Sequence, residues 1–514
     1  MPENTRSISP RLYYRYHAEQ VIFTSELRQK TLNSLWWSAA DNFGVQLLLF
    51  LINVIMARQV PPEGYGLIAM LSIFMAIAQS FVDSGFSSAL IQKQDAGEVH
   101  YSSIFYFNIV MGLVMAGLLC WASPYIASFY GQAILTPLAC FMSLNLIIGS
   151  LGSVPNSLMK KNLDFRSQTI ASLLSAVFSG IIGIALALYG WGVWSIAAQN
   201  VALTLFRTVF LWILGTWRPT RSFSMSVLGE MFGFGSRLLA AGLIDVIFTN
   251  LYQLVIGKIF SARDLGFYTQ ASRIKQLPAG GLSAIVSRVS FPVLALIQND
   301  PVQCRHALRK AVGFLGMVNF PLTIGLAVCA QPVVMVLLTN RWASVIPYLQ
   351  ILCAVALFYP LQVINLNVVT ALGRSDLFFR LEIWKKLLTV ANIIIAYRWG
   401  VLGIVYGQVI VAFLSYLINS SSSAELVGYS TWDQARDLSP YLLVSIIMGF
   451  LVMLISYMVN LDYLLLLTVQ IVSGAVIYIG LCRILRLEVF METQMVLLEA
   501  AGALGVNLKK KWIR

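Results

Sequence analysis

The chain is a succession of about fourteen apolar runs, each close to the twenty residues that an α-helix needs to cross a bilayer core. Two of these apolar runs are 47–56 and 104–121. Short polar loops join the runs, and little sequence is left over for a water-soluble domain. In hydrocarbon every backbone polar group must be paired within its own segment, so the runs are predicted to be membrane-spanning helices. The predicted fold is an all-α polytopic membrane protein.

Composition agrees with this class and excludes others. Of the 514 residues, 58% are hydrophobic and only 11% are charged, which is far from the composition of a soluble domain. The formal net charge of +13 is not gathered in one basic stripe, so no nucleic acid partner is expected. The six cysteines form no Cys-x-x-Cys pair and the three histidines are not near a Cys or Glu at ligand spacing, so neither a metal site nor a cofactor is expected.

The distribution of Lys and Arg predicts the orientation. If the amino terminus is cytoplasmic, 25 Lys and Arg residues fall on the cytoplasmic side, against five on the other side. This bias is typical of cytoplasmic loops, so both termini are predicted to lie in the cytoplasm of a bacterial inner membrane protein. Residues 1–30 lack the continuous apolar stretch of a removable signal peptide and are predicted to form a cytoplasmic arm.

An internal match indicates a duplicated architecture. Residues 53–68, NVIMARQVPPEGYGLI, align without a gap on residues 253–268, QLVIGKIFSARDLGFY, so that Gly66 meets Gly266. An even number of spans separates the copies, which predicts two lobes of six helices in the same orientation. The expected organisation is an arm at 1–32, an N-lobe at 33–217, a C-lobe at 218–420, two additional helices at 421–486 and a basic cytoplasmic tail at 487–514.

Charged residues within the apolar runs are the candidate site residues. Charges at bilayer depth are costly, so they tend to face a wet cavity or a partner. Arg273 is the preferred substrate-binding candidate, because it lies within a run, close to a second cation, Lys275, and five residues before Pro278. A basic cavity suits an anionic group such as a diphosphate, which Arg can hold by paired hydrogen bonds.

The other charged positions leave alternatives open. Arg237 is a further substrate-binding candidate, but it can equally pair with Asp245 as a structural bridge. Asp41, Asp83 and Asp245 are candidates for ion coupling or gating, although an Asp near the start of a helix is also favoured by the helix dipole. Arg288, towards the cytoplasmic end of its run, is expected to extend to the membrane surface.

Three segments carry a family resemblance when they are taken in order. They are DSGFSSALIQK at 83–93, GIALALYGWGVWSIAAQ at 183–199 and IGKIFSARDLGFYTQASRIKQLP at 256–278, the last followed by FPVLALIQND at 291–300. In this order the segments resemble the Wzx-type oligosaccharide-lipid flippases of the MOP exporter superfamily, in particular its polysaccharide transport exporters of the colanic-acid and lipopolysaccharide type.

The resemblance implies two six-helix lobes with two C-terminal helices. It also implies alternating access and movement of an undecaprenyl-diphosphate-linked oligosaccharide across the inner membrane, for exopolysaccharide, capsule or O-antigen synthesis. A polysaccharide polymerase and export machinery are the implied protein partners. In the related lipid II flippases, a motif similar to ASRIKQLP supplies an arginine essential for the lipid diphosphate, and Arg273 is the matching position. Those flippases have basic residues in their first two spans, where this chain has Asp41 and Asp83, so only Arg273 is carried over.

Two other classes of protein compete with this interpretation. A multidrug antiporter of the MATE type shares the superfamily fold and uses an acid in the first span, but its usual substrates are cationic and the second lobe here is basic. A membrane glycosyltransferase or polysaccharide polymerase is disfavoured, because the chain has no Asp-x-Asp pair and no loop long enough for a nucleotide-sugar domain. Tyr252, Tyr268 and Tyr359 are candidates for stacking on sugar rings.

Overall fold

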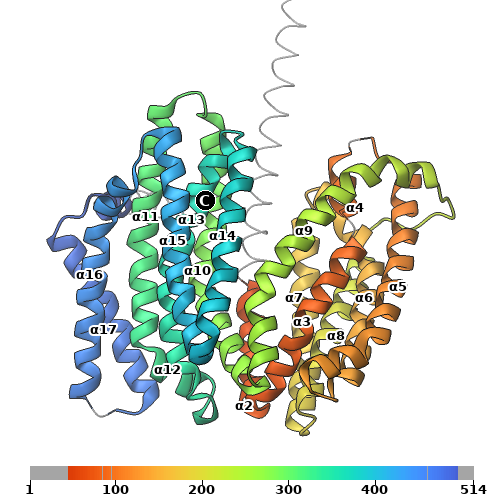
Figure 1. The fold of residues 1–514 in the computed structure, drawn as a ribbon, viewed down its shortest axis with the longest axis horizontal. Coiled ribbons are helices and arrows are strands. Elements are labelled where there is room, and N and C mark those ends of the chain that lie inside the picture. Colours follow the sequence, from red (N-terminus) through yellow and green to blue (C-terminus); the bar gives the residue numbers. More distant parts are fainter. Residues whose placement is uncertain (1–43, 84, 94, 460, 496–514) are drawn as a thin grey trace, which may run out of the picture. The chain divides into compact units, whose positions relative to one another are not determined.

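A computed structural model describes residues 44–495 except 84, 94 and 460, and the described residues form helices and loops only (Figure 1). Twelve helical stretches in this part of the chain are long and apolar enough to cross a membrane, and one of them, 375–427, contains two helices. A shorter apolar helix, α2 (Gln46–Gln59), precedes them. The prediction of an all-α polytopic membrane protein with about fourteen spans is confirmed.

The chain divides into two compact units, which are described separately. Among the described residues, the first contains 44–60 together with 71–250, and the second contains 61–70 together with 251–495. These units do not test the predicted lobe boundaries, which stay a prediction.

The first unit is built from helices that pack in pairs. α5 packs along α6, α7 along α8, and α6 also contacts α8. Polar side chains support the apolar contacts: Thr208 Oγ1 and Trp212 Nε1 of α8 donate to the carbonyl oxygens of Ile148 and Leu151 in α6, at 3.1 and 3.0 Å. Besides α2, its helices are α3 (Pro62–Asp83, from residue 71), α4 (Phe86–Gln92), α5 (Glu98–Tyr130), α6 (Leu135–Lys161), α7 (Phe165–Leu188), α8 (Val193–Leu214) and α9 (Met225–Ile259, to residue 250).

The second unit is centred on α13, which packs against α10, α11 and α15. Asn319 of α11, 1% exposed, donates to the carbonyl oxygens of Ala356 and Leu357 in α13 at 3.0 and 3.1 Å. α16 packs on α11 and α17 packs on α16, so the last two long helices lie on one side of this unit (Figure 1). Its helices are α10 (Ala262–Leu296), α11 (Pro301–Val328), α12 (Ala330–Leu337), η2 (Asn340–Trp342), α13 (Val345–Ala371), α14 (Ser375–Ala396), η3 (Tyr397–Trp399), α15 (Gly400–Val427), α16 (Thr431–Met458) and α17 (Tyr463–Ile484), with the ends of α3 and α9.

The two turns that align in sequence meet within the second unit. α3 begins at Pro62 and α10 begins at Ala262. The two helix starts are therefore separated by 200 residues, the same separation as Gly66 and Gly266. A Cβ atom on Gly66 would lie 1.7 Å from the carbonyl oxygen of Ala262, and one on Gly266 would lie 2.0 Å from the carbonyl oxygen of Pro62. Each glycine therefore lies against the first residue of the other copy's helix, four positions before the other glycine. This reciprocal contact is what two copies of one motif related by a twofold rotation produce, and it supports the duplication.

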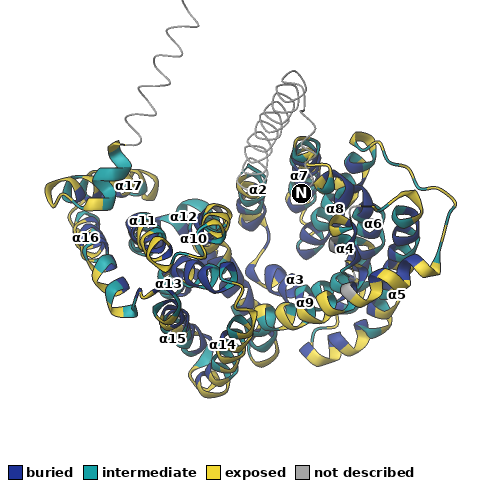
Figure 2. Cartoon of the chain, turned by 90° about the horizontal axis from the view of Figure 1, so that it is seen from above, coloured by how far each residue is buried: buried dark blue, intermediate teal, exposed yellow. Residues whose placement is uncertain are grey.

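Many large apolar side chains remain exposed on the helices. Figure 2 shows exposed residues along the outer faces of the helices, with α5 and α9 as clear examples. Leu118 of α5 is 49% exposed and Val476 of α17 is 65% exposed. A soluble protein rarely leaves such continuous apolar surface in water, whereas a bilayer covers it without penalty.

Candidate functional site

The site is best described from α10, the 35-residue helix that carries the preferred candidate. Ser261 caps its start, since the Ser261 hydroxyl accepts a hydrogen bond from the backbone N–H of Asp264 at 3.0 Å. Arg273, Gln276 and Arg288 are all exposed. Positions three to four residues apart share a face of a helix, so Arg273 and Gln276 belong to one polar stripe of α10.

Arg273 lies over an aromatic ring instead of against a carboxylate. Its guanidinium carbon is 5.9 Å from the centre of the Tyr65 ring, and within the described residues no Asp or Glu is within ion-pair distance of it. Tyr65 is 2% exposed and packs edge-on against the fully buried Trp342, with ring centres 5.4 Å apart. The ring is held next to the reciprocal contact, because Tyr65 directly precedes Gly66. A cation–π contact leaves the N–H groups in the guanidinium plane available for an anion.

Lys275 has a different environment from Arg273. It is partly buried, and the side chain close enough to interact with its charge is Cys353 of α13. Two residues along a helix correspond to a rotation of about 200°, so the two cations point to different sides of α10. The structure places Arg273 on an accessible face and Lys275 toward the neighbouring helix, and it does not bring the two side chains together.

The remaining charged candidates belong to the first unit or lie outside the described residues. Arg237 and Asp245 are both exposed on α9, and no ion pair joins them in the part of the chain that the structure describes. Asp83 is exposed at the end of α3, where it accepts a hydrogen bond from Gln79 Nε2 at 3.3 Å. Asp41 lies outside the described residues. Their roles in substrate binding and ion coupling stay predictions.

A buried amide–tyrosine network joins four helices of the second unit and was missed from the sequence. Asn392 Nδ2 of α14 donates to the Tyr252 hydroxyl at 3.1 Å and to the Ile404 carbonyl oxygen at 3.3 Å. Gln408 Nε2 of α15 donates to the Tyr268 hydroxyl at 3.2 Å. Tyr268 is 6% exposed, so the interpretation of Tyr268 as a surface for sugar stacking is wrong. Asn392 and Gln408 stand alone in apolar runs, and this was the available signal.

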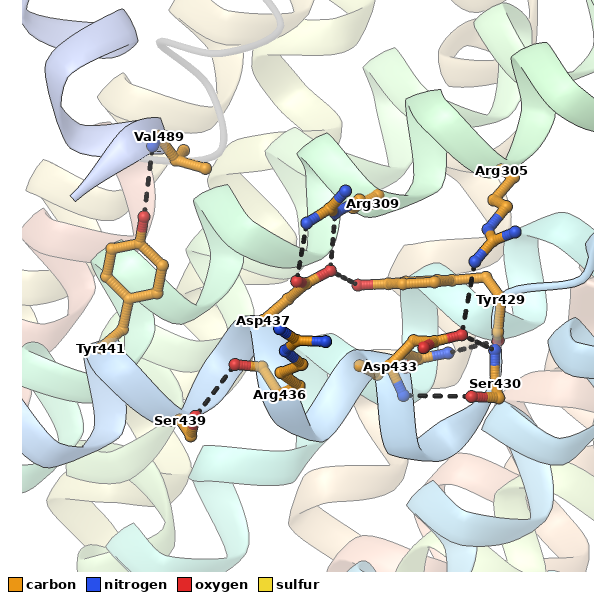
Figure 3. Close-up of polar contacts among 11 residues, drawn as sticks. Arg305, Arg309, Tyr429, Ser430, Asp433, Arg436, Asp437, Ser439, Tyr441 and Val489 are labelled. Carbon is orange, nitrogen blue, oxygen red and sulfur yellow. Dashed lines mark hydrogen bonds and ion pairs between the residues drawn. The ribbon is translucent and has the colours of Figure 1, made fainter.

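Several cations at the predicted cytoplasmic ends of α11 and α16 are neutralised locally, as Figure 3 shows. Arg309 Nε and a terminal guanidinium nitrogen donate to the two oxygens of Asp437 at 2.8 and 3.0 Å. Arg305 pairs with Asp433 at 3.4 Å, one helical turn away on both helices. The Tyr429 hydroxyl donates to Asp437 at 2.8 Å, and burial raises the pKa of Tyr429. This charged cluster fastens α16 to α11 and leaves no unpaired cation at these two arginines.

A further ion pair lies in the first unit, outside the spans. Lys93 Nζ contacts Glu230 Oε2 at 2.6 Å, and Lys161 Nζ donates to the Lys93 carbonyl oxygen at 2.6 Å. The hydrogen bond between the pair raises the pKa of Lys93 and lowers the pKa of Glu230. Two of the basic residues that gave the orientation signal therefore connect the end of α4 to α6 and α9.

Comparison with known proteins gives consistent results. The sequence profile of a family described as polysaccharide biosynthesis protein matches residues 55–347. The chain is 27% identical over 400 residues to the lipopolysaccharide biosynthesis protein WzxC of Escherichia coli (strain K12), covering 76% of this chain and 81% of WzxC. It is 25% identical over 422 residues to the succinoglycan biosynthesis transport protein ExoT of Rhizobium meliloti (strain 1021), covering 82% and 83%.

The fold also matches a solved structure. The lipid II flippase MurJ, in an inward closed conformation, superposes with a TM-score of 0.71 at 17% identity, covering 88% of this chain and 98% of MurJ. At this level of identity the likeness concerns the fold.

Proposed function

Since the chain belongs to the polysaccharide biosynthesis protein family, whose profile matches more than half of its length, we propose that it moves undecaprenyl-diphosphate-linked oligosaccharide units across the bacterial inner membrane. It is a multi-pass membrane transporter of the Wzx-like exporter type and not an enzyme. The proposal adds the chemical nature of the cargo and the direction of movement, from the cytoplasmic to the outer leaflet. The product would serve exopolysaccharide, capsule or O-antigen synthesis.

The observation that carries the proposal is the environment of Arg273, an exposed cation over an aromatic ring. A guanidinium within a membrane-spanning helix is expensive unless it is hydrated, paired or bound to a ligand. Arg273 is exposed and lies over the Tyr65 ring, with no carboxylate of a described residue within ion-pair distance. A diphosphate offers oxygen atoms in a geometry that suits the paired N–H groups of a guanidinium. The cation is therefore available for an anionic head group that reaches membrane depth.

In the proposed cycle the diphosphate binds Arg273 while the polyprenyl tail stays in the bilayer. Alternating access then exposes the sugar on the other side of the membrane. Arg237 and Lys275 are proposed to assist by adding positive charge. Asp41, Asp83 and Asp245 are proposed for ion coupling or gating, and an Asp41→Asn variant whose transport is unchanged across proton and sodium gradients would exclude Asp41.

The proposal is tested by replacing Arg273 in cells that depend on this chain for polymer export. Arg273→Ala is expected to reduce exported polymer at least tenfold while the lipid-linked precursor accumulates on the inner leaflet. Arg288→Ala is the matched control, because it removes an exposed arginine from the same helix, and it is expected to keep most of the export. Membrane abundance of both variants is measured in parallel. Normal export by Arg273→Ala at normal abundance would contradict the proposal.

A MATE-type antiporter remains the second candidate, favoured by the exposed carboxylates of Asp83 and Asp245. It predicts that the chain lowers cellular accumulation of cationic dyes. It also predicts that Asp83→Asn or Asp245→Asn abolishes this effect, whereas Arg273→Ala leaves it intact. Dye efflux with unchanged glycan precursors would therefore favour the antiporter.

A further inference from the structure

A cavity of about 720 Å³ lies in the second unit, away from Arg273. Its walls come from α11, α12 and α13 on one side and from α16, α17 and their connection on the other. The lining residues come from the late part of α11 and α16 and the early part of α13 and α17. The cavity is therefore at the opposite ends of α11 and α16 from the charged cluster of Figure 3. By the predicted orientation, this is the outer half of the membrane.

The chemistry of the lining is polar but uncharged. The polar side chains include Gln331, Gln350, Gln470, Tyr457 and Tyr463, and no Asp, Glu, Lys or Arg is among the residues that line the cavity. The rest of the wall consists of Thr323, Ser456, Cys353, Met453 and aliphatic residues. Such a surface offers hydrogen bonds and apolar contact but nothing to neutralise a phosphate.

Gln470 lines this cavity and carries a hydrogen-bond acceptor that has no donor among the described residues. The side chain is 2% exposed, and its Nε2 donates to Ser456 Oγ at 2.5 Å. Ser456 Oγ in turn donates to the Val452 carbonyl oxygen at 3.2 Å, so the serine proton is already used. Gln470 Oε1 is buried, and no described residue donates to it. A buried acceptor without a donor is unfavourable, and a rotation of the Gln470 side chain toward the cavity would let an O–H group of a ligand satisfy it.

The cavity opening adds aromatic and amide groups to this acceptor. Tyr457 and Tyr463 are 80% and 45% exposed, so their rings are accessible. Gln331 is also exposed and offers both a donor and an acceptor. A pyranose ring has an apolar face that stacks on tyrosine and hydroxyl groups that bind amides. An acyl chain would match the aliphatic wall but would leave Gln470 Oε1 without a donor.

We propose that this cavity binds an uncharged sugar residue, one of whose hydroxyl groups donates to Gln470 Oε1. The inference rests on the proposed function for its biological meaning, because the sugar would belong to the glycan that the chain exports. It adds a second site that is chemically distinct from Arg273: a neutral glycan site on the outer side, separate from the proposed diphosphate site of the carrier lipid. The sugar can be bound while still attached to a lipid or after release.

The test measures sugar binding to the full chain in lipid nanodiscs by saturation-transfer NMR. The probes are methyl glycosides of glucose, galactose and mannose, which are water-soluble, and decyl glucoside, which carries an alkyl chain. Sugar-ring protons are expected to receive saturation from the protein. Gln470→Met keeps an unbranched side chain but removes the acceptor, and it is expected to weaken binding of the preferred sugar at least fivefold. The affinity of decyl glucoside relative to methyl glucoside distinguishes a lipid-attached sugar from a released one.

Three control variants keep the result interpretable if Gln470→Met is unstable. Ser456→Ala removes the partner of Gln470 Nε2 but keeps Oε1, and it is expected to retain binding. Gln494→Met removes another glutamine whose buried Oε1 has no donor among the described residues, but outside the cavity, and is expected to have no effect. Leu466→Trp adds bulk to the cavity wall one helical turn before Gln470 and is expected to abolish binding.

Three outcomes would overturn the inference. They are no ring-proton signal with any methyl glycoside, a signal that survives both Gln470→Met and Leu466→Trp, and saturation confined to the decyl chain, which would identify the cavity as an acyl-chain site. Sugar binding in Arg273→Ala separates the two proposals. If Arg273→Ala exports normally while binding still depends on Gln470, the proposed function fails and the sugar site stands.

Discussion

Substituting the two aligned glycines is the most direct test of the reciprocal contact between α3 and α10. In Gly66→Ala the new Cβ would lie 1.7 Å from the Ala262 carbonyl oxygen, and in Gly266→Ala it would lie 2.0 Å from that of Pro62. Ordinary contact begins at 3.4 Å, so the backbones must move apart by the difference, 1.7 and 1.4 Å respectively. The obstacle is backbone on both sides, so no side-chain rotation relieves it. We expect each variant to lose about 3 kcal/mol of stability, at the upper end of overpacking costs.

The assay is thermal unfolding of the purified protein in detergent, followed by intrinsic tryptophan fluorescence. Both variants are expected to unfold several degrees below the wild type, by similar amounts, because the contact is reciprocal. Gly117→Ala in α5 is the matched control, since a Cβ there meets no atom within 4 Å. That control is expected to be neutral or slightly stabilised, because alanine favours helix over glycine by about 1 kcal/mol. If Gly66→Ala and Gly266→Ala unfold like Gly117→Ala, the close contact between the two helix starts is refuted.

Three further variants test contacts within each unit. Asn365→Ala removes a fully buried amide that exchanges hydrogen bonds of 2.9 and 3.1 Å with Gln434, and should cost about 2 kcal/mol in a denaturant or thermal assay. Asp437→Asn weakens the charged cluster of α11 and α16 and should cost about 0.5–1 kcal/mol, because its arginine partner is 56% exposed and screened by water. Glu230→Gln should lower the unfolding temperature at neutral pH only. The pKa of Glu230 is held below its ordinary 4.5 by Lys93, so the pair stabilises the folded state above that pH, and the difference from the wild type should vanish in acid. A difference that is constant with pH would exclude an electrostatic origin.

The fold could be predicted from the sequence to a large extent because hydrophobic length is a local property. Each span is specified within its own twenty or so residues, and the membrane fixes what such a run must become. The aligned turns were also detectable, since Gly66 and Gly266 are required by one close contact and must be retained together. The sequence could not show that these two glycines lie against each other's helix starts, because nothing local encodes the rotation that relates two copies.

The site was only partly predictable, and the missing part depends on pairing between distant residues. Arg273 was identified because a cation in an apolar run is rare. Lys275 was grouped with it by sequence proximity, but helix geometry sends it toward Cys353 instead. Tyr268 was assigned to sugar stacking, yet Gln408, 140 residues away, holds its hydroxyl in the interior. Single amides in apolar runs give no indication of which helix they will bind.

The positive charge of the chain divides into two physically different populations, and this division argues for where the anion binds. Arg305 and Arg309 are neutralised by Asp433 and Asp437, so their contribution to binding an external phosphate is small. Arg273 lies over an aromatic ring and has no described carboxylate within ion-pair distance, so its charge stays available to a ligand. A diphosphate would gain more from this single arginine than from the denser charged cluster. Arg237 of α9 and Arg288 of α10 also have no carboxylate partner among the described residues, so what distinguishes Arg273 is its position over the Tyr65 ring within a membrane-spanning helix.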